Sequence, residues 1–366
     1  MKVETAIIGG GVIGLSIGWR LAQAGQRVVI VERGKTGMGA SHAAAGMLAA
    51  GVEVEPTEGV LWQLNRRSQQ LWPDFARELE AASRMAIHYR REGTLSVALS
   101  SDDLRRLQQV FEFQRGHGVN LEWLSAAFCR EREPALSSQI KGGIFSPADH
   151  QVDNRLLAQA LRQAFLTAGG QLIEDREARL VESNQRITGI DCGAAEPITA
   201  THTLLAGGAW SGRVAGLPNG VTVPIRPIKG QMLAVESDLP APIASVVWSP
   251  TVYLVPRENG RLLIGATVEE AGFDPRLSFG GIFGLMEGAW RVLPALEEAK
   301  ISEFWSGFRP GSPDDAPMLG EIFPGLILAS GHHRNGILLT PITAALISEH
   351  ILNGTVLPEA FLPHRF

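Results

Sequence analysis

Short apolar runs that end in glycine alternate with amphipathic stretches along the chain. Residues 3–11 (VETAIIGGG) form a β-branched apolar run ending in glycine, which is typical of a buried parallel strand. Residues 15–25 then place apolar side chains at helical spacing, and residues 26–33 (QRVVIVER) form a second apolar run. This pattern predicts a strand, a helix and a second strand at the start of the chain.

The rest of the chain predicts helices and mostly antiparallel strands. Asn259-Gly260 separates two alternating runs, which is a strong hairpin signal, and Asp153 stands where a helix N-cap is expected. Residues 325–331 and the helical stretch after them repeat the strand–glycine–helix order of the first unit. The remaining predicted elements are a strand at 93–99 and helices at 58–85, at 100–118 with Ser101 or Asp102 as cap, and at 285–296.

This order predicts an α/β fold, in which one discontinuous Rossmann-like nucleotide-binding domain is interrupted twice by a mainly antiparallel β-sheet domain. The nucleotide-binding domain is expected to comprise residues 1–88, 143–222 and 306–366. The β-sheet domain is expected to comprise residues 89–142 and 223–305.

The glycines after the first strand carry the first chemical signal. Gly9, Gly11 and Gly14 fit the spacing G-x-G-x-x-G, and Glu32 lies near the end of the second strand. Gly9 permits a tight turn, Gly11 lets the backbone approach a pyrophosphate, and Gly14 lets helix and strand pack closely. Unpaired N–H groups at the helix start would face the phosphates. Glu32 would accept hydrogen bonds from a ribose diol and repel a 2′-phosphate, which disfavours NADP.

This motif leaves FAD and NAD open, and a strand–helix–strand unit without ligand is the alternative reading. Residues 34–51 are small and rich in glycine and alanine, so their backbone could lie against a large flat group such as an isoalloxazine ring.

Composition excludes several function classes. The net charge of −5 and the pI of about 6.0 in a chain of 366 residues argue against a nucleic-acid partner. Cys129 and Cys192 lie far apart without histidine or cysteine at metal spacing, so a metal site is not expected and a reduced, cytoplasmic setting is. The apolar runs are too short to span a bilayer, so no integral membrane segment is expected.

Several segments together resemble the D-amino-acid oxidase branch of the FAD-dependent amine oxidoreductases, and most of all its glycine-oxidase subgroup in thiamine biosynthesis. The segments occur in order over nearly the whole chain. They are IIGGGVIGLSIGWRLA (7–22), AAAGML (43–48), LLAGGAWSG (204–212), PIKGQM (227–232), YLVPR and GRLLIGAT (within 253–267), FWSGFRPGSPDDAP (304–317) and GHHRNGILLTP (331–341).

The resemblance implies that the discontinuous nucleotide-binding domain (1–88, 143–222 and 306–366) is an FAD-binding domain and that the β-sheet domain (89–142 and 223–305) is the substrate-binding domain. It implies FAD bound noncovalently at the bottom of a substrate cavity. His42 lies one position from where relatives with a covalently attached flavin carry histidine, which makes covalent attachment the alternative. The residues that the resemblance assigns to the cofactor are Gly9, Gly11, Val12, Ile13, Gly14, Glu32, Arg33, Ala43, Ala44, Ala45, Gly46, Met47, Ala178, Gly207, Gly208, Trp210, Arg309, His333, Arg334, Asn335, Gly336 and Ile337.

The resemblance also implies a substrate site. Arg309 matches the arginine that binds the substrate carboxylate, for which a planar guanidinium is suited. Gly307, Pro310 and Gly311 flank Arg309 and are residue types found in stiff turns, so a turn is expected to restrain its backbone. Tyr253, Met47 and Arg334 are assigned to the same site. D-amino-acid oxidases proper bring two tyrosines to the substrate, whereas this chain has only Tyr89 and Tyr253, and Tyr89 does not match the second position. This departure favours the glycine-oxidase-like subgroup.

The implied reaction is oxidative deamination of glycine or another small amine acid, such as sarcosine or a small D-amino acid. A hydride passes from the substrate Cα to flavin N5, O2 reoxidises the flavin and gives H2O2, and water hydrolyses the imine. No side chain is assigned as acid or base. The alternatives are an FAD-dependent dehydrogenase of the D-proline or hydroxyproline type, passing electrons to a quinone or carrier, and a flavin-binding protein without turnover. The resemblance leaves a homo-oligomer open.

Three further groups have two readings each. His332 and His333 could suggest a metal pair, but a loop beside the flavin is favoured because no cysteine or carboxylate cluster accompanies them. Lys229 could be catalytic, but a structural or cavity-edge role is favoured. The tryptophans are expected in the core, with Trp248 a candidate for the cavity wall; they are Trp62, Trp72, Trp248, Trp290 and Trp305.

Overall fold

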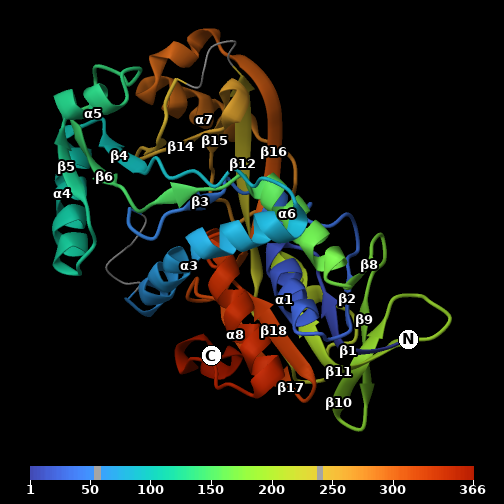
Figure 1. Ribbon diagram of the computed structural model, residues 1–366. Coiled ribbons are helices and arrows are strands. Elements are labelled where there is room, and N and C mark those ends of the chain that lie inside the picture. Colours follow the sequence, from blue (N-terminus) through green and yellow to red (C-terminus); the bar gives the residue numbers. More distant parts are fainter. Residues whose placement is uncertain (53–58, 237–241) are drawn as a thin grey trace.

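Two eight-stranded sheets form the framework of the computed structural model, which describes residues 1–52, 59–236 and 242–366 (Figure 1). The first sheet lies in the lower half of Figure 1. Its strands in spatial order are β17 (Met318–Phe323), β18 (Leu326–Ser330), β11 (Ile198–Leu205), β1 (Lys2–Ile8), β2 (Val28–Val31) and β8 (Gln171–Ile173), with β10 (Arg186–Asp191) paired to β11 and β9 (Arg179–Ser183) paired to β10.

The centre of the first sheet is parallel and buried on both faces. β1 pairs in parallel with β11 and β2, and β11 pairs in parallel with β18. Successive side chains of a strand point to opposite faces. Ile7 accordingly belongs to one apolar cluster, while Ala6 and Ile8 belong to another. This explains why residues 3–8 read as a continuous apolar run rather than as an alternating one.

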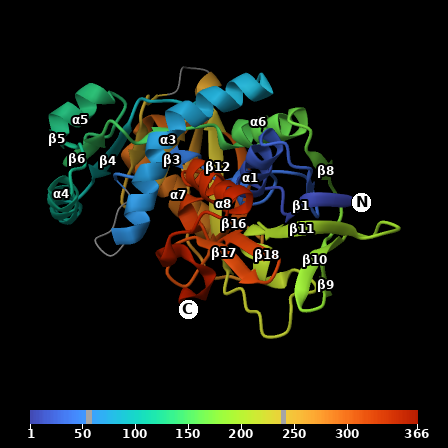
Figure 2. The same ribbon diagram turned by 60° about the horizontal axis from the view of Figure 1, so that its bottom comes forward.

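One face of this sheet is covered by helices from distant parts of the sequence. They are α1 (Val12–Gln23), α3 (Gly59–Ser83), α6 (Asn154–Thr167) and α8 (Thr340–Asn353). Figures 1 and 2 both show α8 beside α1, although more than 300 residues separate them. The repeated strand–glycine–helix order therefore places both ends of the chain in one layer.

The second sheet lies in the upper half of Figure 1 and is antiparallel except for the β13–β4 pair. Its strands in spatial order are β16 (Lys300–Gly311), β12 (Arg226–Glu236), β15 (Arg261–Gly265), β14 (Tyr253–Pro256), β13 (Val246–Trp248), β4 (Thr94–Ala98), β6 (Gly142–Ser146) and β5 (Glu122–Ser125). The other elements of the described chain are α2 (Ala40–Ala43), α4 (Ser101–Gly116), α5 (Ala126–Arg132), α7 (Phe279–Val292) and the two-stranded pair β3 (Met47–Leu48) and β7 (His150–Gln151).

The two faces of the second sheet have different neighbours. Leu233 and Val235 of β12 pack in a cluster with α7 residues. Met232 and Ala234, on the other face of the same strand, pack in a cluster with Ala45. The second face therefore looks toward the glycine-rich loops that follow the first sheet.

Several local predictions are confirmed. Asp153 caps α6, accepting hydrogen bonds from the next helical N–H groups, and the pair β14–β15 is joined through the predicted turn at 258–260. The helix predicted at 58–85 is α3, although residue 58 lies outside the described residues.

Two helix starts were predicted wrongly. The cap of α4 is Ser100, which forms a capping box with Asp103, rather than Ser101 or Asp102. Helix α7 begins at Phe279 rather than near residue 285. Its first turns contain glycines, which have low helix propensity and hide the start, and the Ser278 side chain caps it.

The surroundings of Arg309 also differ from the prediction. The sequence suggested a rigid turn built by Gly307, Pro310 and Gly311, but all three lie in β16, which pairs with β12 as far as Gly311. Proline is tolerated there because β16 is the edge strand of the sheet. Arg309 is thus held by a strand rather than by a loop.

The predicted division into two domains stays a proposal. All strands of the first sheet come from the segments assigned to the FAD-binding domain. Most strands of the second sheet come from the segments assigned to the substrate-binding domain, while β6 and β16 cross the proposed boundaries.

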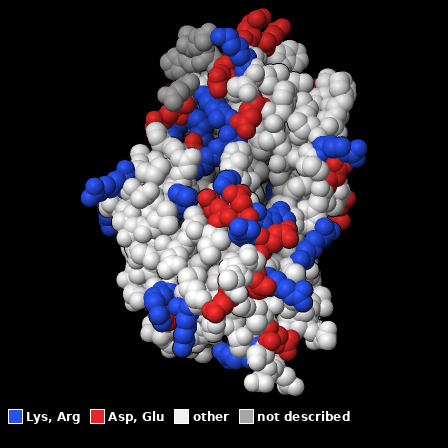
Figure 3. Space-filling view, turned by 90° about the vertical axis from the view of Figure 1, so that its right-hand side faces the viewer, with Lys and Arg blue, Asp and Glu red and all other residues white. Residues whose placement is uncertain are grey.

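Basic and acidic side chains are interspersed over the face of the molecule seen in Figure 3.

Candidate active site

A cavity of about 750 Å³ lies between the two sheets. Ile8, Val31 and Ser330, at the carboxyl ends of three strands of the first sheet, form part of its wall. Met232 and Tyr253 of the second sheet form another part. In α/β sheets, ligands bind beyond the carboxyl ends of the parallel strands, so this is the expected place for a nucleotide.

Two glycines where β1 passes into α1 have no room for a side chain. Gly9 has a φ of +110°, and a Cβ on it would lie 2.4 Å from the carbonyl oxygen of Ala206. A Cβ on Gly14 would lie 2.0 Å from the carbonyl oxygen of Gly9. The two glycines therefore let β1 and α1 pack closely, and Gly11 and Val12 line the cavity at the start of α1, where the positive end of the helix dipole lies.

Glu32 is oriented by the same loop. Its Oε2 accepts a hydrogen bond from the Gly10 N–H at 2.8 Å, and its Oε1 accepts one from the Gly34 N–H at 3.1 Å. Each carboxylate oxygen can accept more than one hydrogen bond, so both can still receive ribose hydroxyls. Glu32 lines the cavity, as this role requires.

The segment from Ala43 to Met47 runs along the cavity between the two sheets. A Cβ on Gly307 of β16 would lie 2.3 Å from the Cβ of Ala43, and the indole N–H of Trp305 donates to the carbonyl oxygen of Ala43 at 3.1 Å. Gly46 has a φ of +73°, and a Cβ on it would lie 2.0 Å from the carbonyl oxygen of Val152. The segment is thus a fixed wall made of backbone and small side chains.

These features fit a long dinucleotide with a flat ring at one end. Gly9, Gly11 and Val12 would hold the pyrophosphate, and Glu32 the ribose. The alanine-rich wall leaves a smooth surface for a flavin, and Trp210 and Gly208 also line the cavity.

Arg309 extends from β16 and lines the cavity. Its Nη1 donates to the carbonyl oxygen of Thr267 at 3.1 Å and more weakly to that of Lys229 at 3.5 Å. Within the described part of the chain, these are its hydrogen bonds, so Nε and Nη2 keep their donors for a ligand. Tyr253 also lines the cavity, with its ring centroid 5.4 Å from that of Trp248.

Two neighbouring histidines line the cavity and are neutral near pH 7. Burial lowers the pKa of His332 to about 3, and its Nε2 lies 3.0 Å from the hydroxyl oxygen of Thr343. Burial lowers the pKa of His333 to about 4, although Asp315, whose carboxylate lies 3.3 Å from Nδ1, acts in the opposite direction. These side chains therefore add no fixed positive charge to the cavity.

The structure brings almost all of the predicted site residues together. Every residue assigned to cofactor or substrate lines the cavity, with the exception of Gly14, which packs beneath the loop. Their individual roles stay proposals. Sequence reasoning missed Ser41, whose hydroxyl accepts a hydrogen bond from the Val12 N–H at the start of α1. It also missed Gly230 and Gly265, although both lie in segments that carried the resemblance.

Other candidates lie elsewhere. Tyr89 is not among the described residues that line the cavity. Its hydroxyl instead lies 2.6 Å from Nδ1 of His150, which does not line the cavity either. The cavity wall includes the neighbours of His42 but not His42 itself. Trp290 is half exposed, contrary to the core position expected for it, whereas Trp248 does line the cavity.

Two kinds of feature are absent from the described residues, that is, from the chain without the segments 53–58 and 237–241. No group of three or more His, Cys, Asp or Glu side chains there could hold a metal ion. No helix in those residues has the length and apolar character that crossing a membrane requires.

The model of the family described as "FAD dependent oxidoreductase" (DAO) matches residues 4–350. The chain belongs to this family. The glycine oxidase of Geobacillus kaustophilus is 37% identical over 352 residues, which cover 95% of this chain and 92% of that protein. A crystal structure of glycine oxidase from the same organism superposes with a TM-score of 0.93 at 35% identity, covering 100% of this chain and 99% of that one.

A bifunctional protein ThiO/ThiG of Synechocystis is 39% identical over 376 residues. The match covers 99% of this chain but 54% of that protein, so the chain spans about half the length of this relative. Together the comparisons confirm the predicted family with its glycine-oxidase resemblance, the α/β fold class, the FAD cofactor and the enzyme class.

Proposed function

We propose that this enzyme oxidatively deaminates glycine or another small amine acid, such as sarcosine or a small D-amino acid. The position of Arg309 is the observation that supports this most. It projects from β16 into the cavity where the two sheets meet, and two of its nitrogens are free to donate within the described residues. A guanidinium with an open edge is suited to a carboxylate, which it binds with two parallel hydrogen bonds.

The residues around Arg309 fix the orientation of the substrate. Tyr253 stands at the same end of the cavity, and Met47 and Met232 supply apolar surface beside it. A carboxylate held at Arg309 leaves the Cα and the amine of a small amino acid against the alanine-rich wall. Such positioning supplies much of the rate acceleration when no covalent step is needed. We also assign Arg334, which lines the cavity, to this site.

FAD, held by the glycine loop, Glu32 and the alanine-rich wall, would supply the two-electron oxidation of the substrate Cα–N bond. No residue of the chain is assigned as general acid or base. Both histidines in the cavity wall are neutral near pH 7 because burial lowers their pKa values. The reacting amine is therefore proposed to enter in its neutral form, and the chain contributes binding, orientation and exclusion of water. Hydrolysis of the released imine completes the deamination.

The decisive experiment is anaerobic mixing of the FAD-loaded protein with glycine, sarcosine, D-alanine and D-proline, followed through the flavin absorbance. We expect bleaching with at least glycine or sarcosine, and stoichiometric H2O2 when air is admitted. No bleaching by any of the four would overturn the proposal. Bleaching without H2O2, but with turnover on an added quinone, would assign the enzyme to the dehydrogenase alternative.

A further inference from the structure

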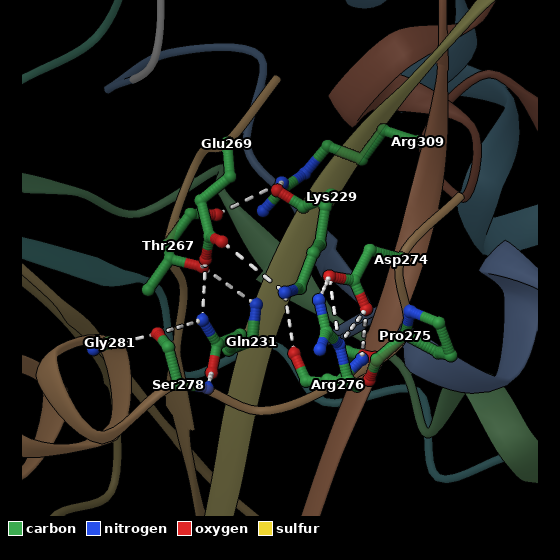
Figure 4. Close-up of polar contacts among 11 residues, drawn as sticks. Lys229, Gln231, Thr267, Glu269, Asp274, Pro275, Arg276, Ser278, Gly281 and Arg309 are labelled. Atoms are coloured by element: carbon green, nitrogen blue, oxygen red, sulfur yellow. Dashed lines mark hydrogen bonds and ion pairs between the residues drawn. The ribbon is translucent and has the colours of Figure 1, made fainter. Parts of the chain in front are cut away.

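Arg309 donates a hydrogen bond to the carbonyl oxygen of Thr267. A cluster of polar side chains surrounds the segment that carries this carbonyl, on the face of the second sheet that points away from the cavity. It consists of Lys229, Gln231, Thr267, Glu269 and Ser278 (Figure 4). We propose that Glu269 is a positioning residue, which fixes the Thr267 carbonyl and through it the guanidinium of Arg309. This inference rests on the proposed function, because it assigns Arg309 to the substrate carboxylate.

The first step is the backbone of residues 267–269. Beyond the end of β15, this segment continues beside β12: Lys229 and Glu269 exchange two backbone hydrogen bonds, each of 2.9 Å. The Thr267 carbonyl, which receives Arg309 Nη1 at 3.1 Å, stands two residues earlier. The location of this carbonyl therefore depends on how firmly the segment is docked on β12.

The second step is the carboxylate of Glu269, on which three donors converge. It accepts hydrogen bonds from the Thr267 hydroxyl and from Gln231 Nε2 at 2.6 Å, and Lys229 Nζ lies 3.4 Å away. Burial opposes its ionisation, yet these donors hold the pKa of Glu269 below its ordinary value. Gln231 and Lys229 are 0% and 3% exposed, so neither can turn to solvent if the carboxylate is lost.

The third step links the segment to α7. Gln231 Nε2 also donates to the Ser278 hydroxyl at 2.8 Å, and its Oε1 accepts from the Ser278 N–H at 2.8 Å. Lys229 Nζ donates to the carbonyl oxygen of Arg276 at 2.6 Å. Both ends of the loop 266–278 are thus bound to the same two side chains of β12, and Glu269 is the anion that balances the buried ammonium.

The fourth step separates Glu269 from the substrate itself. Side chains alternate along β12: Gly230 and Met232 line the cavity, whereas Lys229 and Gln231 point to the α7 side. Glu269 bonds to the second pair and is absent from the cavity wall of the described residues. Glu269 therefore does not contact the substrate itself, and the hydrogen bonds connect it to the site through the backbone of Thr267 and the guanidinium of Arg309.

The test uses Glu269→Gln in the FAD-loaded protein, with acetate as a carboxylate probe whose binding perturbs the flavin spectrum. The amide keeps the shape but places an NH2 against donors, so buried hydrogen bonds are lost. We expect the acetate Kd and the glycine KM to rise about tenfold, which corresponds to about 1.4 kcal/mol, while kcat changes less and the FAD Kd is unchanged. Glu270→Gln is the matched control, because Glu270 is adjacent and exposed, pairing with Arg226.

A double-mutant cycle distinguishes positioning from general damage. In an Arg309→Ala background, Glu269→Gln is expected to have no further effect on acetate binding, since there is no guanidinium left to position. An equal loss in both backgrounds, or an acetate Kd like that of wild type in Glu269→Gln alone, would overturn the inference. If Arg309→Ala itself leaves acetate binding intact, the proposed function fails instead. Should Glu269→Gln not retain FAD, Thr267→Val, which removes one donor to Glu269, takes its place with the same expectations.

Discussion

The guanidinium of Arg309 lies directly against Gly230: a Cβ on Gly230 would be 2.6 Å from Nη1 and 3.0 Å from Cζ. The atoms it would meet are the far end of a flexible side chain, so the protein can accommodate alanine by moving Arg309. Gly230→Ala is therefore expected to fold and to bind FAD normally, but to raise the glycine KM at least tenfold. Steady-state kinetics and thermal melting check this. Gly280→Ala, where a Cβ meets nothing within 4 Å, should leave KM as it is.

Arg309→Lys tests the geometry of the carboxylate site rather than its charge. An ammonium cannot offer two parallel donors to one carboxylate, and hydrogen bonds to charged groups are worth about 1.5–3 kcal/mol each. We expect kcat/KM for glycine to fall about a hundredfold, with the FAD Kd unchanged. A variant within twofold of wild type would show that the substrate carboxylate binds elsewhere.

The fold was largely predictable because its strongest signals are local. The apolar run at 3–8, the glycine loop and the cap at Asp153 depend on neighbours in sequence, and the structure confirms each. The segment around Arg309 was misread for the same reason. Its glycines and proline suggest a turn, and only pairing with β12, about 80 residues earlier, makes it a strand.

The site residues that could be predicted are the glycines whose backbone conformation or close packing excludes other residues, and the residues in segments that resemble the family. The contacts that hold these residues in place could not be predicted. Nothing in the sequence shows that Ser41 receives the Val12 N–H, or that Lys229 and Glu269 meet, because these pairs form only when separate segments dock. The favoured reading of Lys229 as structural agrees with its buried contacts.

Gly14→Ala is expected to damage cofactor binding. The added Cβ would meet the Gly9 carbonyl oxygen at 2.0 Å, and backbone cannot move aside as a side chain can. Overpacking of this kind costs about 1–3 kcal/mol, and here it shifts the loop that faces the pyrophosphate. We expect a lower Tm and an FAD Kd raised more than tenfold, measured by fluorescence titration of the apoprotein. Gly284→Ala, with no atom within 4 Å of its Cβ, should leave the FAD Kd unchanged and should not lower the Tm, because alanine favours the α7 helix more than glycine does.

The flavin is expected to leave the protein on acid denaturation. His42 is the candidate for covalent attachment, yet the cavity wall of the described residues contains its neighbours Ser41 and Ala43 and not its ring. Acid precipitation should therefore give a colourless pellet and a yellow supernatant. A yellow pellet that turns colourless only in His42→Ala would show attachment through this histidine.

His332 makes stability depend on pH in a predictable direction. Burial lowers its pKa from 6.5 to about 3 in the folded protein. Between pH 6.5 and pH 3 the unfolded chain binds more protons at this histidine than the folded chain does. The stability that the neutral, buried imidazole contributes is therefore fully present above pH 6.5. As the pH falls below that value, the free energy of unfolding decreases by up to about 1.4 kcal/mol per pH unit. In the variant His332→Asn, the asparagine side chain does not titrate in this range. The pH dependence that other histidines give to stability is the same in the variant and in wild type, so it cancels when the two are compared.

The expected outcome is that the Tm difference between wild type and His332→Asn, both saturated with FAD, shrinks when the pH is lowered from 7.5 to 5. Wild type loses stability over this range that the variant does not have to lose. His364→Asn, at an exposed position, should show a Tm difference near zero at both pH values. A gap for His332→Asn that stays constant with pH would mean that the imidazole is solvated or charged in the folded protein, contrary to its burial among the cavity wall.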